Sequence, residues 1–161
     1  MSAAFQINGR AVPVAEFYAR ACDPQRSVAV EACAGAGKTW MLIARIVRAL
    51  LEGCEPQDIL AITFTKKAAA DMRKRLGEAL AEFEDMDEAQ ALQALKDRGV
   101  PEPQASAWVQ AVRELAARVL ATGRPVQVRT FHSWFGALLR NAPVSVVHAL
   151  KLPLQYELLE D

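Results

Sequence analysis

Apolar and polar positions follow two different spacings in the first half of the chain. Residues 27–31 form a short, β-branched apolar run followed by a loop of small residues, which is typical of a buried parallel strand. Apolar residues recur at helical spacing over residues 42–51, and Gly53 supplies a helix stop. Residues 59–64 form a second apolar run. The order strand, loop, helix, strand predicts a parallel, right-handed β-α-β unit.

The middle of the chain has helical spacing. Thr65 can cap a helix whose inner stripe is apolar. That expected stripe consists of Met72, Leu76, Leu80 and Phe83. Two further helical stretches are predicted near residues 87–98 and 102–121. We therefore interpret residues 81–124 as a helical insertion.

A strand pattern returns near the end of the sequence. Residues 126–130 predict a third strand that leads into a helix through Trp134. Residues 143–161 show no clear period. At the other end, residues 15–20 fit a short amphipathic helix that stops before Pro24.

Composition limits the class of protein. The 161 residues are 52% hydrophobic, which is enough for one packed domain. Lysine plus arginine and aspartate plus glutamate number 19 each, so any basic site must come from local clustering. No secretion signal and no apolar run of membrane-spanning length occur, which predicts a cytoplasmic protein without a membrane partner.

The three cysteines show neither disulfide nor zinc spacing. Cys22, Cys33 and Cys54 are odd in number and have no C-x-x-C pattern or nearby histidine. We expect them to be small buried or half-buried residues.

A phosphate-binding loop is the clearest chemical motif. The P-loop pattern is matched, with alanine for its first glycine, by Ala32, Cys33, Ala34, Gly35, Ala36, Gly37, Lys38 and Thr39. Backbone N–H groups of such a loop wrap phosphate oxygens, the Lys38 ammonium reaches the β and γ phosphates, and the Thr39 hydroxyl binds Mg²⁺. The predicted cofactors are therefore ATP and Mg²⁺, with Lys38 and Thr39 as catalytic residues. For Trp40, a core position is favoured over stacking on the adenine.

Two further segments give the loop a family context. Residues 62–72 read Ile-Thr-Phe-Thr-Lys-Lys-Ala-Ala-Ala-Asp-Met, and residues 129–134 read Arg-Thr-Phe-His-Ser-Trp. In this order after the P-loop, they resemble the UvrD/Rep group of superfamily 1 DNA helicases, nearest its RecB/AddA-like branch. The resemblance spans residues 27–141 and implies an α/β fold: part of a RecA-like P-loop NTPase motor domain, with a parallel sheet and a helical insertion.

The resemblance also implies a DNA-binding edge. The expected contacts are Phe64, Thr65, Lys66, Lys67, Phe131 and His132. Aromatic rings can stack on bases, and lysines beside a helix N-terminus complement phosphate. The alternatives without DNA contact are that Phe64 is a core residue, that the lysines form a solvated face and that His132 caps its helix.

Departures from the family pattern shape the expected organisation. Gln25 lacks the usual setting of an adenine-reading glutamine, and Trp40 stands where an arginine is usual. The long gap between Lys67 and Arg129 favours the nuclease-linked branch. The resulting division is a lead segment (1–26), a P-loop core (27–80), an insertion similar to subdomain 1B (81–124) and a return to the core (125–161).

The implied function is that of an ATP-dependent DNA helicase or helicase-nuclease. Such a protein moves along single-stranded DNA in double-strand break repair or recombination, acts on single-stranded and duplex DNA, and can pair with a nuclease or helicase subunit. No Asp-Glu pair follows a hydrophobic strand before Asp161, and no arginine finger is recognised. We therefore expect these residues alone to bind nucleotide without hydrolysing it.

Two other functions stay open on the sequence. A small P-loop phosphotransferase would use Lys38 and Thr39 in the same way and clamp an acceptor with residues 73–75. A non-enzymatic interaction module would have a degenerate P-loop and bind a partner protein through residues 102–121.

Overall fold

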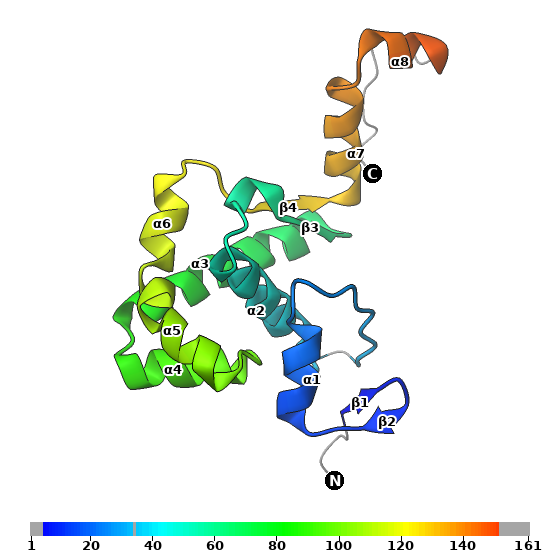
Figure 1. Ribbon diagram of the computed structural model, residues 1–161. Coiled ribbons are helices and arrows are strands. Elements are labelled where there is room, and N and C mark those ends of the chain that lie inside the picture. The colour runs from blue at the N-terminus through cyan, green and yellow to red at the C-terminus, as the bar shows by residue number, and fades with distance from the viewer. Residues whose placement is uncertain (1–4, 34, 152–161) are drawn as a thin grey trace.

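The computed structural model describes residues 5–33 and 35–151 as a mixed α/β structure in which helices dominate (Figure 1). The helices are α1 (Val14–Ala21), α2 (Lys38–Leu51), α3 (Lys66–Asp85), α4 (Glu88–Asp97), α5 (Glu102–Arg113), α6 (Leu115–Ala121), α7 (Phe131–Arg140) and α8 (Val144–Ala149). The strands are β1 (Gln6–Ile7), β2 (Arg10–Ala11), β3 (Leu60–Thr63) and β4 (Gln127–Thr130), and a 3₁₀ turn, η1 (Pro56–Asp58), precedes β3. The expected α/β class is confirmed.

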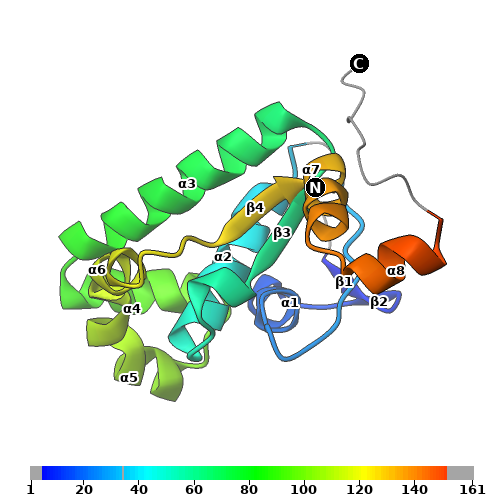
Figure 2. The same cartoon turned by 90° about the horizontal axis from the view of Figure 1, so that it is seen from above.

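A parallel pair of strands joins two distant parts of the chain. β3 pairs with β4 in a register that runs from Leu60 opposite Gln127 to Thr63 opposite Thr130. Figure 2 shows α3 running along the β4 side of this pair. The strands predicted at residues 59–64 and 126–130 are therefore confirmed. None of the four β3 residues is fully buried, and Leu60 keeps 40% of its surface exposed.

The strand predicted at residues 27–31 is wrong for the described structure. This segment is an open stretch between α1 and α2 (Figure 1), and Val28 is 44% exposed. A strand needs a neighbour to pair its backbone groups, and among the described strands none pairs with this segment, since β1 pairs with β2 and β3 pairs with β4. The described parallel sheet therefore has two strands, and a larger RecA-like sheet stays a proposal.

One hydrophobic core connects α2 and α3 with α4, α5 and α6. The predicted stripe on α3 is buried at all four positions: Met72, Leu76, Leu80 and Phe83. Phe83, Leu95 and Leu115 are fully buried in the cluster that also contains Leu50 of α2. The helical stretch expected over residues 102–121 is interrupted at Glu114, where α5 ends and α6 begins. Most of its apolar residues pack into this core, whereas Leu120 of α6 is 79% exposed.

The two ends of the chain agree only in part with the sequence prediction. Asn8 and Gly9, with φ of 51° and 79°, form the turn of a small hairpin between β1 and β2, the conformation that Asn-Gly pairs favour. The helix expected at residues 15–20 is α1, and it ends before Pro24 as predicted. α8 forms within residues 143–161, where no helix was predicted, and α7 and α8 project from the helical body (Figure 1). Within the described ranges, no helix is long and apolar enough to cross a membrane.

The cysteines are only partly as expected. Cys22 is fully buried, whereas Cys33 and Cys54 are exposed because both lie in loops. The part of the chain that the structure describes contains no cluster of three or more histidine, cysteine or acidic residues that could hold a metal ion.

Candidate nucleotide site and aromatic edge

The P-loop enters α2 through glycine conformations. Gly35 and Gly37 both have φ of 79°, in the left-handed region that favours glycine, and Gly37 caps the start of α2. The backbone N–H of Ala36 donates to the Cys33 carbonyl at 3.3 Å. Ala34, also predicted in this loop, lies outside the described residues. The remaining loop is exposed, except that Ala32 is half-buried.

Lys38 folds back onto its own loop. Its Nζ donates hydrogen bonds to the carbonyl oxygens of Ala32 at 2.6 Å and Cys33 at 2.5 Å. Thr39 follows as the second residue of α2 and is half-buried. The loop therefore brings together an ammonium, a hydroxyl and a helix N-terminus, three groups that suit a phosphate with its cation. The small loop residues leave the backbone open to such a ligand.

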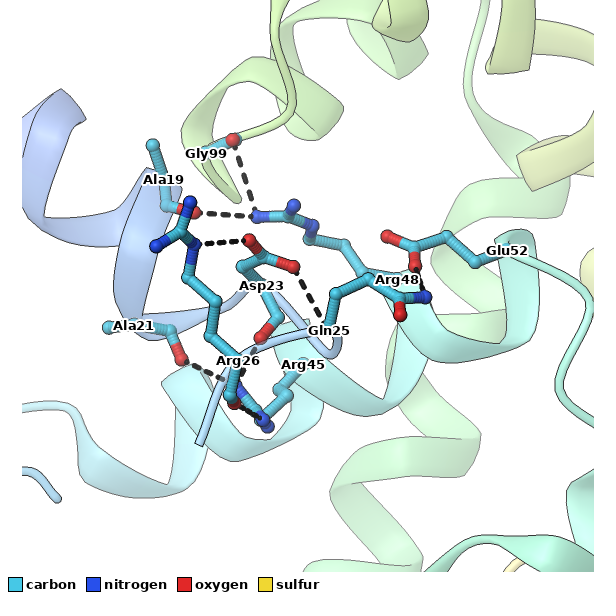
Figure 3. Close-up of polar contacts among 9 residues, drawn as sticks. All are labelled: Ala19, Ala21, Asp23, Gln25, Arg26, Arg45, Arg48, Glu52 and Gly99. Carbon is cyan, nitrogen blue, oxygen red and sulfur yellow. Dashed lines mark hydrogen bonds and ion pairs between the residues drawn. The ribbon is translucent and has the colours of Figure 1, made fainter. Parts of the chain in front are cut away.

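Two arginines on α2 hold the segment that precedes the P-loop, as Figure 3 shows. Arg45 donates to the carbonyl oxygens of Ala21, Asp23 and Arg26. Arg48 donates to Ala19 at 3.2 Å and to Gly99 at 3.3 Å. Arg48 carries a charge, yet it is only 5% exposed. Its burial depends on carbonyl groups distant in sequence, so no local pattern predicted it.

Gln25 and Trp40 lie beside this network. The Gln25 side-chain amide donates to the Glu52 carboxylate at 2.7 Å (Figure 3). Trp40 meets the Tyr18 ring edge-on, with ring centres 5.1 Å apart, and keeps 36% of its surface exposed. The expectation of a core position for Trp40 is therefore wrong: the ring lies at the boundary of the packed interior.

A second candidate site lies where β3 and β4 end. Because Thr63 stands opposite Thr130, the residues that follow both strands emerge side by side. The Phe64 and Phe131 ring centres are 5.4 Å apart, and Phe135 stacks on Phe131 at 6.4 Å. All three rings are exposed, Phe64 by 85%. The structure thus joins two predicted aromatic residues and adds Phe135, which could have been found one helical turn after Phe131.

The polar candidates occupy the first turns of α3 and α7. Thr65 accepts from the Ala68 N–H at 3.1 Å and so caps α3, where Lys66 and Lys67 are exposed. His132 is also exposed, but the cap of α7 is Thr130, which shares a reciprocal capping box with Ser133. The alternative of a helix-capping His132 is therefore wrong. The core alternative for Phe64 is wrong as well, since 85% exposure excludes it.

The residues suggested as an acceptor clamp are already engaged. Arg73 donates to the Val128 carbonyl at 2.8 Å. Lys74 lies 3.6 Å from a Glu78 carboxylate oxygen, and Arg75 pairs with Asp71 at 2.8 Å. These contacts spread the three cations over different partners instead of gathering them around one acceptor.

Comparisons with known proteins find DNA helicases that are similar to part of the chain. An ATP-dependent helicase/nuclease subunit from Clostridium botulinum (strain Hall) is 49% identical over 61 residues, 36% of this chain and 5% of that protein. The protein of the same name from Clostridium perfringens is 44% identical over 68 residues, 40% of this chain and 5% of its own. DNA helicase II of Escherichia coli K12 is 47% identical over 58 residues, 35% of this chain and 8% of its own.

These matches cover less than a tenth of each relative, and no solved structure matches the chain. The family model described as the UvrD/REP helicase N-terminal domain, however, matches residues 15–157, which is most of the sequence. The chain therefore belongs to the UvrD/REP helicase N-terminal domain family.

Proposed function

We propose that this chain is the nucleotide-binding and DNA-contacting N-terminal part of an ATP-dependent DNA helicase that moves along single-stranded DNA. The observation that carries the proposal is the pairing of β3 with β4, which brings Phe64 and Phe131 to one exposed edge. The two rings come from segments far apart in the sequence, and each follows a strand at its carboxyl end. That end of an open parallel sheet is where ligands usually bind.

At the P-loop, the chain's own groups bind the phosphates. MgATP supplies a γ-phosphoryl group whose transfer to water releases free energy for movement. The N–H groups at the start of α2 donate to phosphate oxygens, and the Lys38 ammonium exchanges its two carbonyl partners for them. Thr39 offers its hydroxyl to Mg²⁺. Lys38 thus stabilises the loop before binding and neutralises phosphate charge after it.

At the aromatic edge, different side chains contact the bases and the phosphates of single-stranded DNA. Phe64 and Phe131 stack on bases, an interaction worth about 1–3 kcal/mol per base and tolerant of sequence. Lys66 and Lys67 stand at the N-terminus of the long helix α3, where the helix dipole adds to their attraction for phosphate. His132 lies beside Phe131 on α7 and supplies a polar contact. Thr65 lies between Phe64 and Lys66, and by capping α3 it fixes where the helix that carries the lysines begins.

The family and the names of the relatives, which are helicases or helicase/nuclease subunits, support a wider proposal. We propose that the complete protein couples ATP hydrolysis to movement on DNA in break repair or recombination. In the manner of the RecB/AddA-like branch, it would carry a nuclease activity or pair with a partner that does. Residues 27–80 and 125–161 would form the motor core, and residues 81–124 the insertion. Residues 73–75 have three different partners and do not converge on one acceptor, which weighs against the phosphotransferase alternative.

The test is ligand-induced stabilisation of the 161-residue chain. A ligand that binds only the folded state at a hundred times its Kd adds about 2.7 kcal/mol, equivalent to a rise of about 5–10 °C in Tm. We expect Mg-ATP to raise the Tm of the parent but not of Lys38→Ala, while Lys74→Ala on the exposed face of α3 should respond like the parent. No increase in ATP turnover above background is expected.

The DNA arm uses a single-stranded oligonucleotide and an aromatic variant. The oligonucleotide should add a salt-sensitive increment to the Tm of the parent. Phe64→Ala should reduce this increment because it removes a ring that stacks on a base. The Tm without DNA should change little, because the Phe64 ring is exposed. Val14→Ala, an exposed apolar position on α1, is the matched control. The proposal fails if neither ligand shifts the Tm, and a small phosphate acceptor that replaces DNA in raising nucleotide affinity would favour a phosphotransferase.

A further inference from the structure

A pocket of about 870 Å³ is lined by residues of α3, of β4 and of the loop before β4. Figure 2 shows α3 and β4 running beside each other. Three arginines from different elements line it: Arg73 of α3, Arg124 of the loop before β4, and Arg129 of β4. The guanidinium of Arg73 is held against β4 because it donates to the Val128 carbonyl at 2.8 Å. A guanidinium carries five N–H donors, so this contact leaves donors for a ligand.

The pocket is locally basic in a chain whose total charge is zero. Asp58 is the only carboxylate among its lining residues. Within the described residues, no salt bridge pairs Arg73, Arg124 or Arg129 with an acidic group. The lining therefore has an excess of two positive charges.

The other lining groups suit a ligand with polar and apolar parts. The floor includes Leu76, Val119 and Val128, which are apolar. Gln57 also lines the pocket, and its side-chain oxygen is buried without a hydrogen-bond partner among the described residues. A base could rest on the floor while phosphates meet the guanidinium groups, which bind phosphate through two parallel hydrogen bonds.

We propose that this pocket binds a phosphodiester segment of single-stranded DNA that continues from the aromatic edge. The inference rests on the proposed DNA-binding function and extends it along β4. Arg129 precedes Phe131 by two residues, about 7 Å of extended chain, and Arg124 precedes it by seven, about 23 Å. A DNA strand would need roughly two nucleotides to reach Arg129 from the aromatic edge and roughly seven to reach Arg124. This continuity favours DNA over an acidic peptide, which would share the charge but not the stacking.

The experiment measures the Kd of the full chain for a labelled oligothymidylate at several salt concentrations. Arg124 is the test position because it is exposed and, within the described chain, its side chain makes no hydrogen bond or ion pair. Arg124→Gln should weaken binding about threefold to tenfold at low salt and reduce the slope of log K against log salt by about 0.7, the loss of one phosphate contact on single strands. Arg20→Gln, an exposed arginine on α1, should change neither quantity.

Two further arms separate the outcomes. If Phe64→Ala weakens binding but Arg124→Gln does not, the pocket proposal is overturned while the proposed function stands; if neither matters, both fall. Polyglutamate is the competitor that tests for an acidic peptide. DNA would be overturned as the ligand by two results together. Polyglutamate at the same charge concentration would displace the oligonucleotide, and Arg124→Gln would weaken the binding of polyglutamate instead of that of the oligonucleotide.

Discussion

The guanidinium carbon of Arg98 lies 5.5 Å from the centre of the Trp40 ring. It also lies 4.6 Å from the centre of the Phe83 ring, so the cation is held between two aromatic side chains. Arg98 follows α4 in the insertion, and Trp40 follows Thr39 of the P-loop. The contact therefore joins the end of α4 directly to the first turn of α2.

Replacing Arg98 should destabilise the fold in a way that depends on the substitute. Burial lowers the pKa of Arg98, and its Nε has no hydrogen-bond partner among the described residues. The contacts with the two aromatic faces offset part of the cost of removing this cation from water. We expect Arg98→Ala to lower the free energy of unfolding by about 2 kcal/mol, measured by urea denaturation. Arg98→Met keeps the packing and should lose less. Arg20→Ala is the exposed control, and an Arg98→Ala effect as small as that control would contradict this account.

Gly99 makes a close approach that no other residue could make. Its φ is 74°, and an added Cβ would collide with backbone atoms of Tyr18 and Ala19. Gly123 has a similar φ of 62° but nothing within 4 Å of an added Cβ. We expect Gly123→Ala to cost about 1–2 kcal/mol, from the left-handed conformation alone, and Gly99→Ala about 3 kcal/mol or more. Equal losses in urea denaturation would show that the contact between α1 and the α4–α5 loop does not form.

The cap at Thr65 gives a prediction that separates stability from DNA binding. Thr65→Ala removes the acceptor for the Ala68 N–H and should cost about 1 kcal/mol, while Thr65→Ser keeps the hydroxyl and should cost little. Thermal or urea unfolding measures both changes. If Thr65 also contacts DNA, Thr65→Ala weakens oligonucleotide binding at temperatures where the variant is fully folded. Indistinguishable stabilities of the two variants would refute the cap.

The parts of the fold that the sequence predicts are those specified locally. α2 and α3 each carry an apolar stripe, and Thr65 marks where α3 begins. The spacing of their apolar residues is therefore sufficient to predict both helices. The Asn8-Gly9 turn is also a local signal, but the strands that it joins are too short to show an alternating pattern. Residues 27–31 failed for a different reason: an apolar run becomes a strand only beside a neighbour, and the sequence pattern does not reveal which neighbour is present.

The candidate site divides in the same way. Each motif was recognisable separately, yet the contact of Phe64 with Phe131 depends on the register of β3 with β4. The hydrogen bonds of Lys38 to the loop carbonyls depend on how that loop folds. Side-chain chemistry could thus be predicted from residue type and spacing, whereas partners distant in sequence required the structure.

Cys22 gives a prediction on reactivity, because it differs from the other two cysteines. It is fully buried, and its thiol donates to the Met41 carbonyl at an Sγ to O distance of 3.8 Å. Cys33 and Cys54 are exposed. At pH 8 the native chain should alkylate at Cys33 and Cys54 and protect Cys22 until denaturant is added, which mass spectrometry of the peptides can measure. Equal rates at all three sites would contradict the burial.

The same thiol links stability to pH with a definite sign. Burial raises the pKa of Cys22 from its ordinary value of 9.0 to about 11, while the positive charges of Arg48, Arg45 and Arg98 partly oppose the rise. The folded state therefore favours the neutral thiol, and the unfolded chain releases its proton first as the pH increases. The resulting stability is fully present below about pH 9 and is lost as the pH rises towards 11, by at most about 2–3 kcal/mol. Lysines and tyrosines titrate in this range too, so the useful quantity is the difference in unfolding free energy between the parent and Cys22→Ala at each pH. That difference should fall between pH 8 and pH 10.5 if the thiol is responsible, whereas parallel curves would assign the alkaline loss to other groups.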